Sequence, residues 1–78
     1  MTTPDHSEGV NAEIRAGMAR KALTQSDVAS VLGLSQASVN DRLKGRREWR
    51  LDELLKVADL LGVQASALLP APAVGGAA

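Results

Sequence analysis

The chain of 78 residues contains no cysteine, phenylalanine or tyrosine, and it has one histidine and one tryptophan. Without cysteine there is no disulfide and no thiolate metal ligand, and the single His6 cannot build a histidine metal cluster. With Trp49 as the one aromatic residue, a core must be made of Leu, Val, Ile, Met and Ala. Such a core suits closely packed helices, because small side chains let two backbones approach each other.

Long apolar runs are also lacking. No stretch approaches the roughly 18 apolar residues that a membrane span needs, and the first ten residues lack the basic and then apolar order of a signal peptide. We therefore expect a cytoplasmic protein that does not enter a membrane. No nucleophile, acid, base or metal-ligand set has the spacing of an active site, so we expect no enzymatic activity, no cofactor and no small-molecule ligand.

Net charge is zero over the whole chain, but the signs of the charges are segregated. Residues 39–50 hold five basic residues against two acidic ones, a net charge of +3. The flanking residues 1–38 carry a net charge of −1, and residues 51–78 carry −2. The basic excess therefore falls in one short stretch, where it indicates a local surface for an anionic partner.

Apolar residues recur at helical spacing, and no segment alternates as a strand does. We predict an all-α fold, a compact bundle of about five short helices. The predicted helices lie at roughly 8–22, between Thr24 and Gly33, between Ser35 and Gly45, from Leu51 to Gly62, and at roughly 64–69. They form one domain over residues 8–69, between flexible tails at 1–7 and 70–78 that have no periodic pattern.

Local signals mark the helix ends and the inward faces. Thr24 and Asp27 are spaced as a capping box, and Ser35 is an N-cap, whereas Arg50 is a poor one for the fourth helix. The predicted inward residues are Val10, Ile14, Met18 and Ala22; Val28, Ala29, Val31, Leu32 and Leu34; Val39 and Leu43; and Leu51, Leu54, Leu55, Ala58 and Leu61. Trp49 is expected to cover the end of this core beside Leu51 and Leu54.

The segment 24–45 holds two short capped helices separated only by Gly33, Leu34 and Ser35. A glycine in this turn lets the chain bend sharply, so we expect the two helices to cross at a large angle. The outward face of the later helix carries polar and small side chains: Gln36, Ala37, Asn40, Asp41 and Lys44. Amides on an exposed helix suit the reading of base edges in the major groove, where Gln or Asn can pair with adenine.

At these residues the chain resembles the lambda-repressor-like helix-turn-helix domains of the Cro/cI type, also called the xenobiotic-response-element family. The resemblance covers residues 8–69. The matching residues are Thr24, Gln25, Val28, Ala29, Leu32, Gly33, Ser35, Gln36, Val39, Gly45, Leu51, Leu54, Leu55, Ala58, Leu61, Gly62 and Val63. The resemblance implies a helix-turn-helix whose third helix docks in the major groove of DNA.

The resemblance also implies roles for individual residues. Base edges would be read by Gln36, Ala37, Asn40 and Asp41, and phosphates would be contacted by Gln25, Ser38, Lys44, Arg46 and Arg47. Gln25 would in addition brace Gln36. Two residues depart from the family pattern: Arg42 stands at a position that is usually apolar, so that Leu43 becomes the inward residue, and Met18 stands where arginine is frequent.

The implied function is a sequence-specific DNA-binding transcriptional regulator, of the repressor or Cro type of phages and bacteria. It would bind a pseudo-palindromic operator in double-stranded DNA as a homodimer, at least when on DNA. One alternative is a phage excision or antitoxin component that binds both DNA and a protein partner. A second is a protein-interaction adaptor that keeps the fold without reading DNA, and the zero net charge keeps this alternative open.

Overall fold

The computed structural model describes residues 6–68, and this part of the chain is helical with no strand. The elements are α1 (His6–Lys21), α2 (Gln25–Leu32), α3 (Gln36–Leu43), α4 (Leu51–Leu61) and the 3₁₀ turn η1 (Ala65–Ala67). The all-α prediction is confirmed. The first helix begins before residue 8, and the last predicted helix is a single 3₁₀ turn. Residues 1–5 and 70–78 of the predicted tails, and residue 69 of the last predicted helix, lie outside the described residues.

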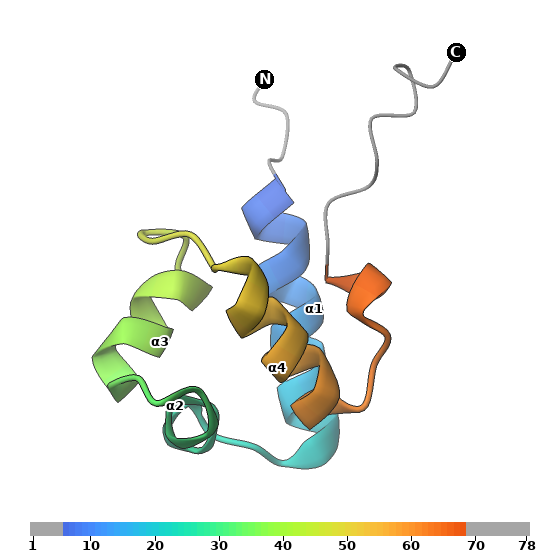
Figure 1. Cartoon of the computed structure of the whole chain (residues 1–78), viewed down its shortest axis with the longest axis horizontal. Coiled ribbons are helices and arrows are strands. Elements are labelled where there is room, and N and C mark those ends of the chain that lie inside the picture. The colour runs from blue at the N-terminus through green and yellow to red at the C-terminus, as the bar shows by residue number, and fades with distance from the viewer. Residues whose placement is uncertain (1–5, 69–78) are drawn as a thin grey trace.

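The helices pack around one centre (Figure 1). α2 contacts α3 and α4, α1 contacts the same two helices, and η1 packs on α4. Figure 1 shows α2 almost along its own axis, whereas α3 runs across the view. The two helices therefore cross one another rather than run side by side, as the short turn at Gly33 leads us to expect.

Local capping contacts fix the starts of α2 and α3. The Thr24 hydroxyl accepts the Asp27 backbone N–H at 3.1 Å, and the Asp27 carboxylate accepts the Thr24 N–H at 2.8 Å. The predicted capping box is thus complete, and the two bonds from Thr24 lower the pKa of Asp27 below its ordinary value. The Ser35 hydroxyl accepts the Ser38 N–H at 3.1 Å at the start of α3.

All four α-helices end in the same backbone arrangement. A residue with positive φ follows the last helical turn, and the next N–H donates to a carbonyl five residues earlier, which is the Schellman motif. Three of these residues are glycines, including Gly33 with φ of 70°. After α1 the position is occupied by Ala22 with φ of 55°, and the Leu23 N–H donates to the Met18 carbonyl at 2.9 Å.

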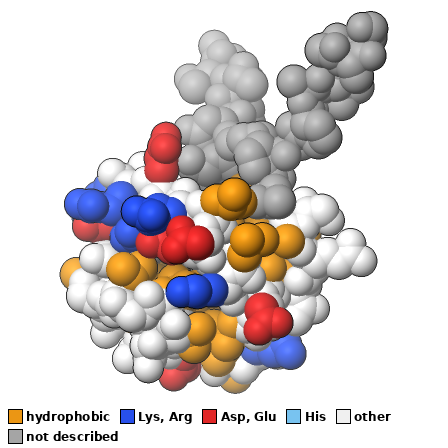
Figure 2. Space-filling model, viewed as in Figure 1, with side chains coloured by type: hydrophobic (Ala, Val, Ile, Leu, Met, Phe, Trp, Pro, Cys, Tyr) orange, Lys and Arg blue, Asp and Glu red, His pale blue; other side chains and the backbone are white. Residues whose placement is uncertain are grey.

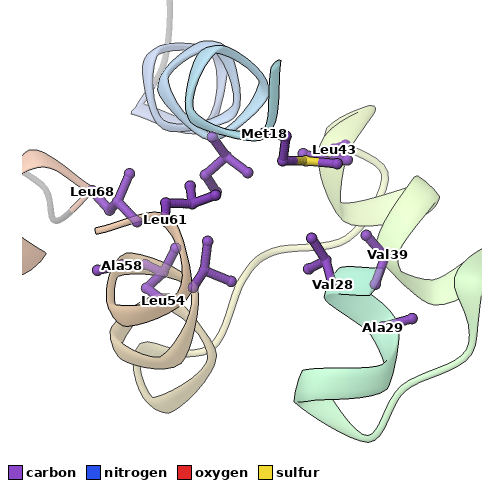
Figure 3. Close-up of a cluster of buried hydrophobic side chains, with 11 residues drawn as sticks. Met18, Val28, Ala29, Val39, Leu43, Leu54, Ala58, Leu61 and Leu68 are labelled. Atoms are coloured by element: carbon purple, nitrogen blue, oxygen red, sulfur yellow. The ribbon is translucent and has the colours of Figure 1, made fainter. Parts of the chain in front are cut away.

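The core lies where α1, α2, α3 and α4 meet (Figure 3). Its fully or nearly fully buried apolar residues are Ile14, Met18, Val28, Ala29, Val39, Leu43, Leu54, Val57, Ala58, Leu61 and Leu68. In Figure 3, Met18 of α1 points toward Leu43 of α3, and Val28 of α2 lies beside Val39. Trp49 is partly buried and packs against this core, as its position in the sequence predicts.

Several predicted inward residues are exposed. Ala22 lies beyond the end of α1, and Val31, Leu51 and Leu55 are 50%, 62% and 46% exposed. The predicted Leu54, Ala58 and Leu61 are buried on the inward face of α4, and Val57 lies there in place of Leu51 and Leu55. The exposed leucines of α4 also recur at helical spacing, so periodicity alone does not tell which apolar residues of this helix face inward.

Candidate nucleic-acid interface

The outer surface of α3 carries the residues predicted to read bases. Gln36 and Ala37 are exposed in the first turn of the helix, and Asn40 and Asp41 are half-buried one turn later. Because Ser35 caps this end of α3, the first turn has a defined backbone geometry. The structure therefore brings the four predicted base-reading residues together on one helix surface.

Gln25 is the first residue of α2 and is half-buried. Around this turn the side-chain hydrogen bonds join Thr24 to Asp27 and Ser35 to Ser38, including a 3.0 Å bond between the two serine hydroxyls. None of these bonds joins Gln25 to Gln36. The bracing of Gln36 by Gln25 that the family resemblance implies therefore stays a prediction.

The loop that follows α3 exposes Lys44, Arg46 and Arg47. Arg46 lies 3.7 Å from the Asp41 carboxylate, which gives this acidic residue of α3 a basic partner. Lys44 and Arg47 have no ion-pair partner among residues 9–68. Figure 2 shows Lys and Arg side chains gathered, with acidic ones between them, where α3 and this loop meet.

The basic stretch offers less free charge than the sequence indicates, because Arg42 is buried. Its side chain is 8% exposed and makes two bonds to the Glu53 carboxylate, Nε to Oε1 at 2.9 Å and Nη2 to Oε2 at 3.2 Å. A third bond runs from Nη1 to the Ser38 carbonyl at 3.1 Å. The structure thus corrects the expectation that Leu43 alone is inward here, because both Arg42 and Leu43 are buried.

Glu53 serves two elements at once. Besides pairing with Arg42 of α3, its Oε1 accepts the Arg50 backbone N–H at 2.9 Å and so closes the start of α4. This contact supplies the cap that the Arg50 side chain cannot provide. Burial alone would raise the pKa of Glu53, but the bonds from Arg42 and from the Arg50 backbone outweigh burial and lower it.

A second polar cluster holds the C-terminal end of α3 against α1. Asn11 is 3% exposed, and its Nδ2 donates to the Arg42 carbonyl at 2.9 Å while its Oδ1 accepts the Trp49 Nε1–H at 2.7 Å. One helical turn further along α1, the Arg15 guanidinium donates to the Leu43 carbonyl. Sequence reasoning missed Asn11, Arg15 and Glu53. A signal was available in Asn11, a polar residue at helical spacing from Ile14 and Met18.

Other kinds of site find no support in the described part of the chain. No group of three or more His, Asp or Glu side chains within residues 9–68 could hold a metal ion. No helix in that range is long and apolar enough to cross a bilayer.

Comparison with known proteins identifies the family. The helix-turn-helix family model matches residues 14–68. Two solved structures have the same fold, each with a TM-score of 0.74. One is the clp gene regulator ClgR from C. glutamicum, 24% identical, with 85% of this chain and 86% of that chain covered. The other is a hypothetical transcription factor, NHTF from Neisseria, 25% identical, with 99% and 92% covered. No curated protein shows a significant match.

The matched region contains α2, α3 and the turn between them, as well as α4 and η1. It includes the exposed surface of α3 and the basic loop described above. The match extends over more than half of the chain, and the family consists of non-enzymatic DNA-binding proteins. The chain therefore belongs to the helix-turn-helix family of the Cro/cI type and is a DNA-binding transcriptional regulator.

Proposed function

We propose that this protein is a sequence-specific repressor that acts in the cytoplasm, reading an operator with α3 and binding it as two copies. The observation that carries the proposal is the exposed first turn of α3, with Gln36 and Ala37, ahead of a loop that exposes Lys44 and Arg47. Within residues 9–68 no acidic side chain pairs with these two cations. An amide can pair with a base edge, and exposed cations attract the phosphates on either side. A repressor needs nothing more than such occupancy to block polymerase.

In this proposal the residues divide into two groups. Gln36, Ala37, Asn40 and Asp41 read base edges from one surface of α3, and Gln25, Ser38, Lys44, Arg46 and Arg47 contact phosphates. Asp41 either accepts from a cytosine amino group or keeps Arg46 in place, because a lone carboxylate would repel the DNA backbone.

A pair of copies is needed because one such module buries only about 600–1,000 Å² on DNA. The exposed surface of α4 supports a contact between copies. Leu51 and Leu55 lie one turn apart on it, and Lys56 stands between Asp52 and Asp59 in the sequence. Two antiparallel copies of α4 would match lysine with aspartate and leucine with leucine, which is the self-complementarity a two-fold interface requires.

The test is selection of bound sequences from a random duplex pool, followed by Gln36→Ala. We expect a pseudo-palindrome with half-sites about one helical turn apart, and loss of preference at one base pair per half-site in the variant. A bidentate pair supplies about 1–3 kcal/mol of discrimination, whereas affinity for random duplex should be unchanged. Gln64→Ala is the matched control, because this exposed glutamine lies outside the helix-turn-helix.

Two outcomes would contradict the proposal. An equal loss of affinity of Gln36→Ala across all operator variants would make Gln36 a backbone contact or a structural residue. Absence of any salt-sensitive binding to duplex DNA would favour the protein-interaction adaptor instead, because phosphate contacts always release counterions.

A further inference from the structure

The proposed base-reading residues stand at one end of α3, whereas the directional contacts that hold the helix stand at the other. α3 has eight residues, which gives it a length of about 12 Å. Along α2 it is held by apolar contacts such as Val28 with Val39, and apolar attraction does not depend on direction. A tilt of about 10° around the C-terminal end would displace the first turn by about 2 Å, far more than a hydrogen bond tolerates.

The contacts at the C-terminal end come from α1. Asn11 and Arg15 lie one helical turn apart and donate to two consecutive carbonyls of α3, those of Arg42 and Leu43. Two anchors at neighbouring carbonyls restrain both the tilt and the rotation of α3. The positive guanidinium also meets the negative end of the α3 dipole, which strengthens its contact.

The cluster around these anchors is itself fixed. The Trp49 Nε1–H donates to the Asn11 Oδ1. This bond fixes the orientation of the amide, so the Asn11 Nδ2 points toward the Arg42 carbonyl. The Arg42 side chain is bonded in turn to Glu53 of α4. Every buried side-chain nitrogen and oxygen of the described residues has a partner. A fully satisfied polar cluster has one arrangement, which apolar packing alone does not impose.

We propose that Asn11 and Arg15 are positioning residues that set the orientation of α3 on DNA, and hence sequence specificity, without touching DNA themselves. The inference rests on the proposed operator reading by α3. Asn11 is nine-tenths buried or more and cannot reach a groove. Arg15 is exposed and its Nη2 donates to the Leu43 carbonyl, so the salt dependence measured below distinguishes positioning from a phosphate contact.

The experiment compares Arg15→Ala with Arg20→Ala. Both variants remove one cation from α1, but Arg20 is exposed and lies 3.9 Å from Glu13 of the same helix rather than on α3. Affinity is measured for the selected operator and for random duplex at several salt concentrations. We expect the ratio of the two affinities to fall at least about fivefold in Arg15→Ala, the loss expected when one base contact is displaced. The ratio should be unchanged in Arg20→Ala and partly restored in Arg15→Lys, which keeps a cationic donor.

The affinity ratio separates positioning from simple destabilisation. A destabilised protein has fewer folded molecules, which lowers both affinities by the same factor and leaves their ratio unchanged. Asn11→Ala provides a second variant. The indole N–H resonance of Trp49, the only tryptophan, should shift when its Asn11 acceptor is removed, and the affinity ratio should fall as in Arg15→Ala.

Three results would overturn the inference. If wild type prefers its operator and both variants keep the wild-type ratio, the positioning role fails and operator reading stands. If Arg15→Ala reduces the slope of affinity on salt by about one unit, Arg15 is a phosphate contact instead. If wild type itself binds all duplexes equally, the proposed operator reading fails, and the positioning role fails with it.

Discussion

Ala22 adopts a backbone conformation that favours glycine. Its φ of 55° lies in the left-handed region, where an L side chain approaches the following carbonyl. The same position after α2, α3 and α4 is occupied by Gly33, Gly45 and Gly62. The first helix therefore ends in the same motif with a residue that is strained there.

Ala22→Gly should raise the free energy of unfolding by about 0.5–1 kcal/mol, because relief of the strain exceeds the added flexibility of the unfolded chain. Thermal and urea unfolding would measure the change. Ala16→Gly is the control, since Ala16 is exposed in the interior of α1 and glycine there should destabilise by about 1 kcal/mol. Equal destabilisation by both substitutions would mean that Ala22 is not strained.

The pair of Arg42 and Glu53 is a buried contact whose loss should be severe. Glu53→Gln leaves the Arg42 charge buried without a counterion, and removal of one partner of such a pair costs about 3–5 kcal/mol. The double variant Arg42→Met with Glu53→Leu should recover most of the loss. Full recovery is not expected, because the Arg50 N–H loses its acceptor.

The same pair predicts a dependence of stability on pH. In the unfolded chain Glu53 titrates near its ordinary value of 4.5, and in the folded protein its pKa is lower. Its contribution is therefore complete above pH 4.5 and disappears as the pH falls through the lowered folded value. Urea unfolding from pH 7 to pH 3 should show this fall in the free energy of unfolding in wild type. The fall should be smaller in the Glu53→Gln variant. Parallel pH curves for the two proteins would be inconsistent with this role of Glu53.

Two glycines of α1, Gly9 and Gly17, differ in how closely other side chains approach them. A Cβ at Gly17 would lie 2.8 Å from the Leu61 Cδ1 and 3.3 Å from the Leu61 Cβ, so α1 and α4 approach closely at this point. A Cβ at Gly9 would have no neighbour within 4 Å. Leu61 is 2% exposed and has little room to move.

The two substitutions to alanine should therefore have opposite effects. Gly9→Ala should stabilise by about 0.5–1 kcal/mol, because alanine is the better helix former. Gly17→Ala gains the same propensity but overpacks the contact with Leu61, which typically costs about 1–3 kcal/mol. The melting temperature of each variant, compared with that of wild type, measures the effect. A stabilised Gly17→Ala would show that α1 and α4 can separate at little cost.

Across the whole molecule, charge neutrality conceals a local basic surface. Pairing inside the fold takes Arg42 out of this surface and reduces the contribution of Arg46, which shares its charge with Asp41. The unpaired cations of the loop are Lys44 and Arg47 among the residues described. Zero net charge is thus compatible with DNA binding, because a local excess of positive charge attracts an anionic partner whatever the total charge of the chain is.

The variants Lys44→Gln and Arg47→Gln should each weaken binding to operator and random duplex alike and reduce the salt slope by about one unit. Asp41→Asn should instead strengthen binding to random duplex, because it frees Arg46 from its acidic partner. Filter binding at several salt concentrations measures both. Arg20→Gln on α1 is the control, because Arg20 is exposed and lies near Glu13 of its own helix, and a slope change as large as that of Arg47→Gln would mean that the loop has no special role.

Much of the fold could be predicted because its signals are local. The Thr24 and Asp27 box, the Ser35 cap and the helix ends at Gly33 and Gly62 each involve residues within five positions of one another. The same local signals outline the helix-turn-helix and therefore the exposed surface of α3. Which residues on that surface touch bases and which touch phosphates stays a prediction.

Four α-helices, the sharp turn at Gly33 and the family resemblance can all be derived from the sequence. The burial of Arg42, the exposure of Leu51 and Leu55, and the contact of Asn11 with α3 depend on how the helices pack. The partners of these residues are distant in sequence: 11 positions separate Arg42 from Glu53, and 31 separate it from Asn11. Periodicity tells which way a side chain leaves its own helix, but the neighbouring helices decide whether water or another side chain meets it there.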